Sequence, residues 1–381
     1  MKKKVLVAMS GGVDSSVVSF LLKEEGYEVV GITMCLGVKE GRGKPACCGR
    51  RAIEDAKRVC RKLKIPHYIM DFSKELEEKI MNKFVSEYLE GRTPNPCIDC
   101  NRYIKFGALL KRAISMGFDF LATGHYARIE NEEPGAESGI RYVLKKGIDT
   151  QKDQSYVLYA MNQEQLGYTL MPLGNFTKGQ VRQVARDAGL PVADKPESQE
   201  ICFIPENNYG EFLKEYVSGG AGPGPIVNKR GEILGEHRGI IFYTVGQRKR
   251  IGIAAREPLY VIAIDRENNT IVVSRKEDVY GDELIADNVN FIHIEKLKEP
   301  IRVEAKIRYL HQPQAAVVVP DGNGKIKVKF DRPQWAITPG QAVVFYGKSF
   351  GRRPVSCQRA GGESDADAVL GGGTIISGNS E

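Results

Sequence analysis

The chain has 381 residues, of which 42% are hydrophobic and 27% are charged. This length exceeds what one hydrophobic core usually organises, and the composition is that of a globular protein. The composition excludes a wholly disordered, collagen-like or mucin-like chain. The length predicts two or three domains. Lys and Arg number 55 against 48 Asp and Glu, a mild basic excess that suits a polyanionic partner without requiring one.

Cysteine content and hydropathy predict the compartment. The eight cysteines are irregularly spaced and far too sparse for a disulfide scaffold, so a reducing compartment is favoured. The apolar run from Val5 to Met9 is too short for a signal peptide, and no run approaches the roughly 18 apolar residues of a membrane helix. We expect a cytoplasmic protein with no membrane partner.

The first part of the chain alternates short apolar runs with longer segments of helical periodicity. Buried strands are predicted at 5–9, 28–34, 67–71 and 120–123, and helices at 14–25, 49–63, 74–89 and 102–116. This alternation predicts an α/β fold with a doubly wound parallel sheet. Its ligand crevice should lie at the C-terminal ends of the strands.

The periodicity changes to two after the Gly- and Pro-rich stretch at 219–225. A hairpin is predicted from strands at 259–265 and 270–274, and further strands at 302–310, 315–319 and 325–330. In the last of these, apolar residues alternate with lysines, which indicates a half-buried strand whose lysines either protect a sheet edge or form a basic face. We expect domains at 1–207, 208–280 and 281–381.

The first predicted strand runs into a Gly-Gly turn and a helix start, Ser10-Gly11-Gly12-Val13-Asp14-Ser15-Ser16. Two glycines let successive amide N–H groups point into one concavity, and the N-terminus of the following helix adds positive potential, so the turn can cradle phosphate. The serine hydroxyls can add donors, while Asp14 can hold Mg²⁺ or order the turn. A tight turn with a helix cap is the alternative.

This loop resembles the pyrophosphate (PP) loop of the ATP pyrophosphatase superfamily, which adenylates a carbonyl or an acid and releases pyrophosphate. The resemblance implies an adenine nucleotide α-hydrolase-like fold and binding of ATP with Mg²⁺. It places the adenine near Met34 and a further contact at Gly124. The residues implied for ATP are Ala8, Met9, Ser10, Gly11, Gly12, Val13, Asp14, Ser15, Met34 and Gly124.

A loop stiffened by Pro94 and Pro96 carries a Cys-x-x-Cys pair, Cys97 and Cys100, directly before a predicted helix. With Asn101 as the N-cap, Cys100 would lie against the positive end of the helix, and its thiolate should be favoured. Arg102 and Lys105 follow close in sequence. Half of a zinc site and an incidental pair are the alternatives.

A third cysteine, Cys202, lies between Ile201 and Phe203, where either core packing or a reactive thiol fits the local sequence. The motifs taken together favour the reactive thiol. They are SGGVDSS, TPNPCIDCN, ATGHYARI, KDQSYVLY, LGNFTKGQVR, SQEICFI and TVGQRKRIG, in this order. The series is similar to the family of tRNA-specific 2-thiouridylases over residues 1 to about 346.

The resemblance implies that ATP adenylates O2 of the wobble uridine and that a cysteine persulfide supplies the sulfur that displaces AMP. Cys100 matches the family's nucleophile and Cys202 its persulfide carrier, and the two can close as a disulfide during turnover. The family also implies a C-terminal β-barrel. A synthetase of the same superfamily, or an RNA-binding protein with a degenerate nucleotide site, are the rival interpretations.

The resemblance also implies contacts with tRNA. The residues concerned are Asn95, Pro96, Cys97, His125, Lys152, Asp153, Gln154, Arg308, Tyr309 and Gln341. We expect lysine, glutamate and glutamine tRNAs as substrates, and a cysteine desulfurase or sulfur carrier protein as donor. The basic turn at 247–250 either binds phosphates or is a solvated face.

Two features depart from the family pattern. Many members have Asp where this chain has Cys97, so Cys97, Cys100 and Cys202 together can hold a 4Fe–4S cluster with one open iron. Cluster-dependent thiolation is therefore an alternative to the persulfide route. A basic, then acidic insertion at 347–368 predicts a surface loop, and its Cys357 receives no catalytic role. Cys35, Cys60 and His67 are predicted core residues, and Cys47 and Cys48 a loop near the site.

Overall fold

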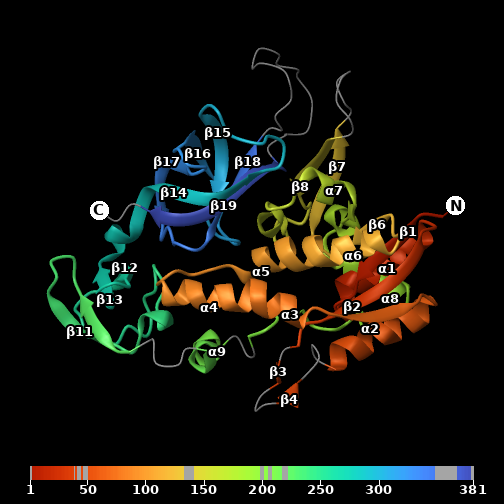
Figure 1. The fold of residues 1–381 in the computed structure, drawn as a ribbon, viewed down its shortest axis with the longest axis horizontal. Helices are drawn as coiled ribbons and strands as arrows, with labels where there is room; N and C mark the ends of the chain where they lie inside the picture. The colour runs from red at the N-terminus through yellow and green to blue at the C-terminus, as the bar shows by residue number, and fades with distance from the viewer. Residues whose placement is uncertain are drawn as a thin grey trace. The chain divides into compact units, whose positions relative to one another are not determined.

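A computed structural model describes residues 2–37, 39–40, 44–45, 50–132, 141–197, 201–204, 208–216, 222–347 and 367–378 (Figure 1). Contacts between Cα atoms divide the chain into two compact units, which are described separately. Unit 1 comprises residues 1–79, 97–207 and 347–370, and unit 2 comprises residues 80–96, 208–346 and 371–381. In the described ranges, no helix has the length and apolarity needed to cross a membrane.

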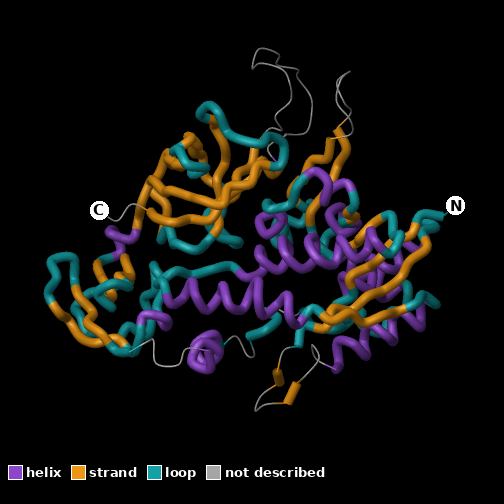
Figure 2. The backbone as a smooth tube through the Cα atoms, viewed as in Figure 1, coloured by secondary structure: helices purple, strands orange, loops and turns teal. Residues whose placement is uncertain are grey.

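Unit 1 is built on a five-stranded sheet with the order β5-β2-β1-β6-β9. Strands are drawn in orange in Figure 2. Its strands are β1 (Lys4–Ala8), β2 (Glu28–Cys35), β5 (His67–Asp71), β6 (Phe120–Ala122) and β9 (Thr169–Leu170). Every neighbouring pair in this sheet is parallel. The strand order reverses direction at β1, so the crevice expected of a doubly wound sheet opens beyond the C-terminal ends of β1 and β6.

The main core of unit 1 lies between this sheet and helices α1 (Val13–Glu24), α2 (Arg50–Leu63) and α8 (Lys178–Asp187). Alternate β1 residues face it, since Val5 and Val7 are fully buried in the same cluster as residues of all three helices. Apolar residues at helical spacing in the helices complete the cluster. The predicted α/β fold with a doubly wound parallel sheet is confirmed.

Two predicted helices contain π-helical stretches. The helix expected at 74–89 consists of α3 (Ser73–Leu76), η1 (Glu77–Met81) and α4 (Asn82–Leu89). The helix expected at 102–116 starts earlier, with α5 (Pro96–Asp99), and continues through η2 (Cys100–Leu109) to α6 (Leu110–Ser115). π-Helical stretches widen the helix and occur often at functional sites. The second of them, η2, begins at Cys100.

The burial expected of β5 is wrong. Its strand exists, but it lies at the edge of the sheet, and Tyr68 and Ile69 are 59% and 45% exposed. His67 is half-buried, and its Nε2 lies 2.9 Å from Thr33 Oγ1. Cys35 and Cys60 are buried, as predicted.

Several short elements of unit 1 were not expected from the sequence. The hairpin β7 (Ala127–Glu132) and β8 (Arg141–Lys146) is antiparallel, and β9 has only two residues, too few for periodicity to reveal. The others are β3 (Lys39–Glu40), β4 (Lys44–Pro45), η3 (Ser155–Leu158), α7 (Gln163–Gly167) and η4 (Pro172–Asn175).

Unit 2 contains a four-stranded sheet with the order β11-β10-β13-β12. Its strands are β10 (Gly224–Val227), β11 (Ile233–His237), β12 (Tyr260–Asp265) and β13 (Thr270–Ser274), and the predicted β12–β13 hairpin is confirmed. Helix α9 (Tyr209–Tyr216) packs against α4 through the ring pairs Phe84–Phe212 and Tyr88–Tyr209. Two short helices, η6 (Ile240–Phe242) and η7 (Lys276–Val279), complete this part.

Six strands of unit 2 form a closed barrel, in which β14 pairs with both β17 and β19. The strands are β14 (Tyr280–Phe291), β15 (Ile301–Lys306), β16 (Gln314–Pro320), β17 (Ile326–Trp335), β18 (Ala342–Gly347) and β19 (Ala368–Gly378). The closure confirms the β-barrel implied by the resemblance.

The lysine strand β17 alternates as predicted, with Ile326, Val328 and Phe330 buried. It is not a sheet edge, because it pairs with β14 on one side and β16 on the other. Lys327 and Lys329 contact opposite carboxylate oxygens of Glu283 on β14 at 2.6 and 3.2 Å. Cross-strand charge pairing, which period-two patterning cannot show, therefore explains these lysines.

Some expectations lie outside the described residues. They concern Cys47, Cys48, Cys357 and the insertion at 347–368 apart from Gly347, Asp367 and Ala368.

Candidate active site

The phosphate loop lies at the C-terminal end of β1, where the doubly wound sheet predicts a ligand crevice. Gly11 has φ +70°, and a Cβ atom there would meet the Ala52 carbonyl oxygen at 2.2 Å, so only glycine fits. Ser10 N donates to Ser15 Oγ at 3.2 Å, and Ser16 Oγ donates to the Gly12 carbonyl at 2.8 Å. These bonds hold the turn in shape before any ligand arrives.

The loop carbonyls are bound from outside. Lys195 Nζ donates to the Gly11 carbonyl at 2.9 Å, and Thr33 Oγ1 donates to the Met9 carbonyl at 3.0 Å. Because C=O and N–H point in opposite directions across a trans peptide, the Gly12 N–H points away from Lys195. Lys195 therefore helps to present a backbone donor on the opposite side of the loop.

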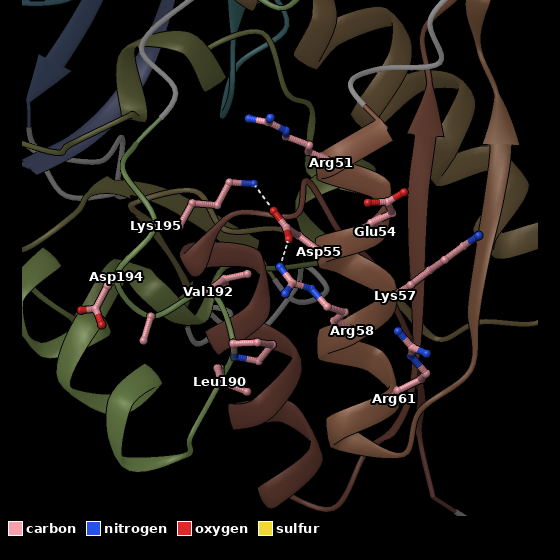
Figure 3. Close-up of a pocket in the computed structure, with 12 residues that line it drawn as sticks. Arg51, Glu54, Asp55, Lys57, Arg58, Arg61, Leu190, Val192, Asp194 and Lys195 are labelled. Atoms are coloured by element: carbon pink, nitrogen blue, oxygen red, sulfur yellow. Dashed lines mark hydrogen bonds and ion pairs between the residues drawn. The ribbon is translucent and has the colours of Figure 1, made fainter.

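Lys195 also lines a cavity of about 740 Å³ between α2 and residues 190–195 (Figure 3). Its Nζ lies 2.6 Å from Asp55 Oδ2, and Arg58 pairs with the other carboxylate oxygen. These two cations hold the pKa of Asp55 below its usual range, although burial acts in the opposite direction and is the largest single influence. The cluster fixes the Lys195 ammonium at the back of the loop.

Gly124 follows β6 and lies directly against the loop. A Cβ atom at this position would be 3.1 Å from both Asp14 Cβ and Ser15 N. The close approach of the two strand ends, β1 and β6, thus depends on a glycine here. The structure brings Gly124 to the loop, as the resemblance implies.

Asp14 is held by two donors at the start of α1. Lys178 Nζ lies 2.7 and 2.8 Å from its two carboxylate oxygens, and the Tyr126 hydroxyl donates to Oδ1 at 2.7 Å. Lys178 also lies 3.2 Å from Glu197, which accepts from Lys152 at 2.7 Å. The hydrogen bonds and positive charges of these two lysines lower the pKa of Glu197. A neutral four-member ion network thus borders the loop.

The remaining residues implied for ATP lie along the same strand ends. Ala8 is the last residue of β1, Val13 is the first of α1, and Met34 is half-buried near the end of β2. The thioether of Met9 accepts from Ser19 Oγ inside the core. Their contacts with a nucleotide stay predictions.

The helix that carries the cysteine pair begins at Pro96, so Asn101 is not its N-cap. Pro fits the first helical position, because its missing N–H would have no partner there. Cys97 therefore lies in the first turn, while Cys100 lies inside the continuous helical segment. Asn101 is buried instead, and its side-chain amide donates to the Val157 carbonyl at 2.9 Å.

The favoured thiolate expected for Cys100 is wrong for this structure. Burial raises the pKa of the Cys100 thiol to about 11, with smaller increases from Cys202, Cys97 and Asp99. The positive charge of Lys105 acts in the opposite direction but is outweighed. The cause is desolvation, which a sequence motif does not reveal.

Three of the cysteines of unit 1, Cys97, Cys100 and Cys202, interact electrostatically. Partial desolvation raises the pKa of Cys97, the charge of Cys202 raises it further, and Lys105 lowers it. Cys97 and Cys202 are exposed and Cys100 is half-buried. The charge of Cys202 thus acts on both members of the Cys-x-x-Cys pair, and the sulfur-transfer roles that the resemblance implies stay predictions.

His125 follows β6 in the chain and contacts Lys105. It is buried, with Nε2 3.4 Å from Lys105 Nζ and Nδ1 2.8 Å from Thr123 Oγ1. Since an ammonium can only donate, Nε2 accepts and the ring proton lies on Nδ1. Burial, and then the charge of Lys105, holds the pKa of His125 well below its usual range, so the ring is neutral. Lys105 connects the histidine with the thiols.

The segment at 152–154 is tied down by its own side chains. The Asp153 carboxylate accepts from the backbone amides of Gly147 and Ser155 and from the Ser155 hydroxyl. Gln154 Oε1 accepts from Tyr126 N at 3.1 Å. These two residues order the turn, and the tRNA contacts expected at 152–154 stay predictions.

Unit 2 holds the other residues implied for tRNA. Asn95 and Pro96 lie where the chain passes from unit 2 to Cys97 in unit 1. Gln341 Nε2 donates to the Thr93 carbonyl at 2.7 Å and so anchors the loop before them. Arg308 donates to the Ala336 carbonyl and to Thr338 Oγ1, at 2.9 and 2.6 Å.

The last tRNA candidates in unit 2 have exposed surroundings. Lys306 Nζ lies 5.8 Å from the centre of the half-buried Tyr309 ring. The turn at 247–250 is held by Gln247, which accepts from Thr244 N and donates to the Lys249 carbonyl. Its basic side chains are exposed, and their role stays a prediction.

Sequence reasoning missed the ion network of the loop. Lys178 and Tyr126 lie within two of the family motifs, LGNFTKGQVR and ATGHYARI, and Glu197 lies directly before SQEICFI, but neither these residues nor Asp55 received a role from the sequence. The signal available was the position of Lys178 and Tyr126 inside these motifs. Which acid meets which base could not be read, because the partners are far apart in the chain.

Three family models match the chain. Their descriptions are tRNA methyl transferase HUP domain for residues 3–206, tRNA methyl transferase PRC-barrel domain for 210–275 and aminomethyltransferase beta-barrel domain for 281–375.

Full-length curated relatives match as well. The protein named tRNA-specific 2-thiouridylase MnmA 1 of Caldanaerobacter subterraneus subsp. tengcongensis is 51% identical over 98% of this chain and 98% of its own length. The MnmA proteins of Acetivibrio thermocellus and Pelotomaculum thermopropionicum are 50% and 54% identical, over 98% and 91% of this chain and 99% and 94% of their own lengths.

Proposed function

Because the chain belongs to the family of tRNA-specific 2-thiouridylases, we propose that it converts the wobble uridine of tRNA to 2-thiouridine at the expense of ATP. The enzyme is a sulfurtransferase. The observation that carries the proposal is the presence of two chemically different groups in unit 1. One is a phosphate loop after β1, and the other is the set of thiols Cys97, Cys100 and Cys202. The charge of Lys105, which contacts His125, acts on Cys97 and Cys100.

The loop supplies the ATP half of the reaction. Backbone donors at Gly11 and Gly12, with the N-terminus of α1 behind them, suit the phosphates of ATP. Adenylation of uridine O2 turns a poor leaving group into a good one and releases pyrophosphate. Asp14 is the residue suited to hold Mg²⁺, which would neutralise phosphate charge, and the ion must compete there with Lys178.

The cysteines supply the sulfur half. Cys202 carries a persulfide, whose terminal sulfur attacks C2 of the adenylated uridine and expels AMP. Cys100 then attacks Cys202 Sγ, which forms the Cys100–Cys202 disulfide and frees 2-thiouridine. A dithiol reductant restores both thiols. Lys105 supports this step because its charge favours the thiolate of Cys100 against the opposing effect of burial.

Residues beside the thiols bind the RNA in this proposal. Asn95, Pro96 and Cys97 contact the target base, which must leave its stack to be modified. His125 and the segment at 152–154 contact tRNA from unit 1, and Arg308, Tyr309 and Gln341 from unit 2. Single-stranded anticodon bases can be turned out at low cost.

A 4Fe–4S cluster is the alternative sulfur carrier. Cys97, Cys100 and Cys202 interact, but in the part of the chain that the structure describes, no group of three or more Cys, His, Asp or Glu side chains is arranged to hold a metal ion. The proposed sulfur transfer therefore uses the Cys202 persulfide and not a cluster. Anaerobic reconstitution with iron and sulfide decides between the routes: full activity in iron-free protein supports the persulfide, and activity that depends on bound iron contradicts it.

The proposal also covers the tRNA substrates, the sulfur donor, the compartment and the domains. The substrates are lysine, glutamate and glutamine tRNAs, and a cysteine desulfurase or a sulfur carrier protein donates sulfur in the cytoplasm. The domains are 1–207, 208–280 and 281–381, and each matched family model lies inside one of these ranges.

The test is a thiolation assay. Purified protein is incubated with ATP, Mg²⁺, cysteine and a cysteine desulfurase, a dithiol reductant and unmodified lysine tRNA, and the digested nucleosides are weighed by mass spectrometry. We expect 2-thiouridine with wild-type protein and none with Cys202→Ala. Pyrophosphate release without thiolation would contradict the sulfurtransferase and favour another synthetase of the superfamily. Methyl transfer, which two family-model descriptions name, would add a methyl mass instead.

A further inference from the structure

Lys178 lies between two carboxylates at the border of the phosphate loop. Its Nζ is 2.7 Å from Asp14 Oδ1 and 3.2 Å from Glu197 Oε1, and its side chain is only 12% exposed. Lysine is rarely this buried unless its ammonium is paired. Here two acids share the ammonium, and Lys152 supplies the second positive charge of the network.

Each of the two carboxylates has a second partner. Asp14 also accepts from the Tyr126 hydroxyl, and Glu197 also accepts from Lys152 Nζ at 2.7 Å. The ammonium can therefore leave either acid without stranding an unpaired carboxylate, which would be costly. The arrangement permits exchange rather than one permanent ion pair.

The backbone of Lys178 is fixed while its side chain is long. Lys178 is the first residue of α8, whose capping box joins Thr177 and Gln180, and its own amide donates to Asp149 Oδ2 at 2.9 Å. A flexible four-carbon stem on a rigid base lets the charge move a short distance at little cost. Asp14, in the first turn of α1 directly after the loop, is already in contact with this charge.

A triphosphate at this loop needs a cation that the backbone donors do not provide. Lys195, the other lysine at the loop, is held behind it by Asp55 and the Gly11 carbonyl. Lys178 is on the side of Asp14 and Gly124, and it pairs with the carboxylate that would face Mg²⁺. Its charge is therefore available to phosphate oxygens.

We propose that Lys178 is a catalytic residue whose ammonium pairs with Asp14 and Glu197 at rest, moves from Asp14 to the terminal phosphates of ATP and stays with the leaving pyrophosphate. No covalent bond forms in this exchange, since only an ion pair changes partner. The inference rests on the proposed function, because it assigns a ligand to the ATP site of that reaction.

A purely structural lysine makes a different prediction. If Lys178 only neutralised Asp14, its loss would disturb the loop as a whole and would weaken every adenine nucleotide alike. If it binds the terminal phosphates, its loss weakens ATP and pyrophosphate but not AMP, which lacks them. AMP is thus the discriminating ligand.

The experiment measures binding of ATP, pyrophosphate and AMP to the full chain by calorimetry with Mg²⁺. For Lys178→Met, we expect ATP and pyrophosphate affinity to fall about 10- to 100-fold, the range for a charged hydrogen bond, and AMP affinity to stay within about twofold. Lys178→Arg should keep most of the ATP affinity. Lys145→Met, which removes a lysine paired with Glu130 at 2.5 Å in the β7–β8 hairpin, is the matched control and should change none.

Equal losses for ATP and AMP, or an unchanged ATP affinity, would overturn the assignment. If Lys178→Met does not fold, Glu197→Gln tests the same idea, because it removes the charge of one of the two acids that pair with Lys178 at rest. We then expect tighter ATP binding and unchanged AMP binding, and weaker or unchanged ATP binding would contradict the exchange. A wild-type chain that binds no ATP would instead overturn the proposed function.

Discussion

Two parts of unit 1, the phosphate loop and the thiols, differ in how their charges are paired. At the phosphate loop, charges are paired and numerous: Asp14, Lys178, Glu197 and Lys152 form a neutral chain of ion pairs. At the thiols, burial raises the pKa of Cys100 to about 11, and the positive charge of Lys105 offsets only part of this increase. The loop therefore has charged groups in place before a charged ligand binds, whereas Cys100 stays protonated as long as its thiol is buried.

The largest effect should come from the thiols, and it should leave the loop intact. We expect Cys202→Ser and Cys100→Ser each to lower tRNA thiolation at least about 1,000-fold, on the scale of losing a nucleophile. ATP affinity by calorimetry should be unchanged, because neither side chain is part of the loop. Cys60→Ala, which removes a buried core thiol, should keep thiolation. Loss of ATP binding in the serine variants would show that the thiols and the phosphate loop do not function independently.

The next effect should come from Asp14. Asp14→Asn removes the charge that pairs with Lys178 and is suited to Mg²⁺, so we expect pyrophosphate release to fall about 10- to 100-fold. The reactivity of the thiols toward iodoacetamide should not change. Asp119→Asn, which alters an acid that accepts from Lys4 N at the other end of the sheet, is the matched control. Equal losses in both variants would assign the effect to stability.

A smaller effect sharpens the account of the thiols. Lys105 lowers the pKa of Cys97 and Cys100, so its replacement by Met should raise both pKa values further. Below the pKa the thiolate fraction grows about tenfold per pH unit, and the curve of alkylation rate against pH should therefore move to higher pH.

Arg102→Met is the control for this shift. Arg102 is on the same helical segment, but its guanidinium lies over the Tyr159 ring, 6.0 Å from its centre. The alkylation profile of this variant should match that of the wild type. A shift as large as that of Lys105→Met would mean that general positive charge, rather than the position of Lys105, acts on the thiols.

The smallest effect concerns the contact between the strand ends. In Gly124→Ala, the new methyl group would lie 3.1 Å from Asp14 Cβ and Ser15 N, so the loop must shift by a few tenths of an ångström. We expect ATP affinity to fall about three- to tenfold, the lower part of the range for overpacking. Gly179→Ala, whose Cβ would have Thr177 Oγ1 at 4.0 Å as its nearest neighbour, should bind ATP normally. An unchanged affinity in Gly124→Ala would show that the loop yields freely.

Local features of the sequence determined the sheet, the phosphate loop and the main helices. Apolar runs and helical periodicity reflect burial of neighbouring residues, and the Gly-Gly turn after β1 has one compatible geometry, with Gly11 at positive φ. The alternation at 325–330 likewise predicted which side chains of β17 are buried. These are properties of short segments, so a sequence carries them directly.

Only the tertiary structure decided how the site is charged and solvated. The helix start at Pro96 rather than Asn101, the desolvation of Cys100 and the exposure of β5 all depend on what packs nearby. The pairing of Asp14 with Lys178 and of Lys105 with His125 joins residues from separate elements. Burial and ion pairing are sums over neighbours brought together by folding, and no local pattern in the chain records them.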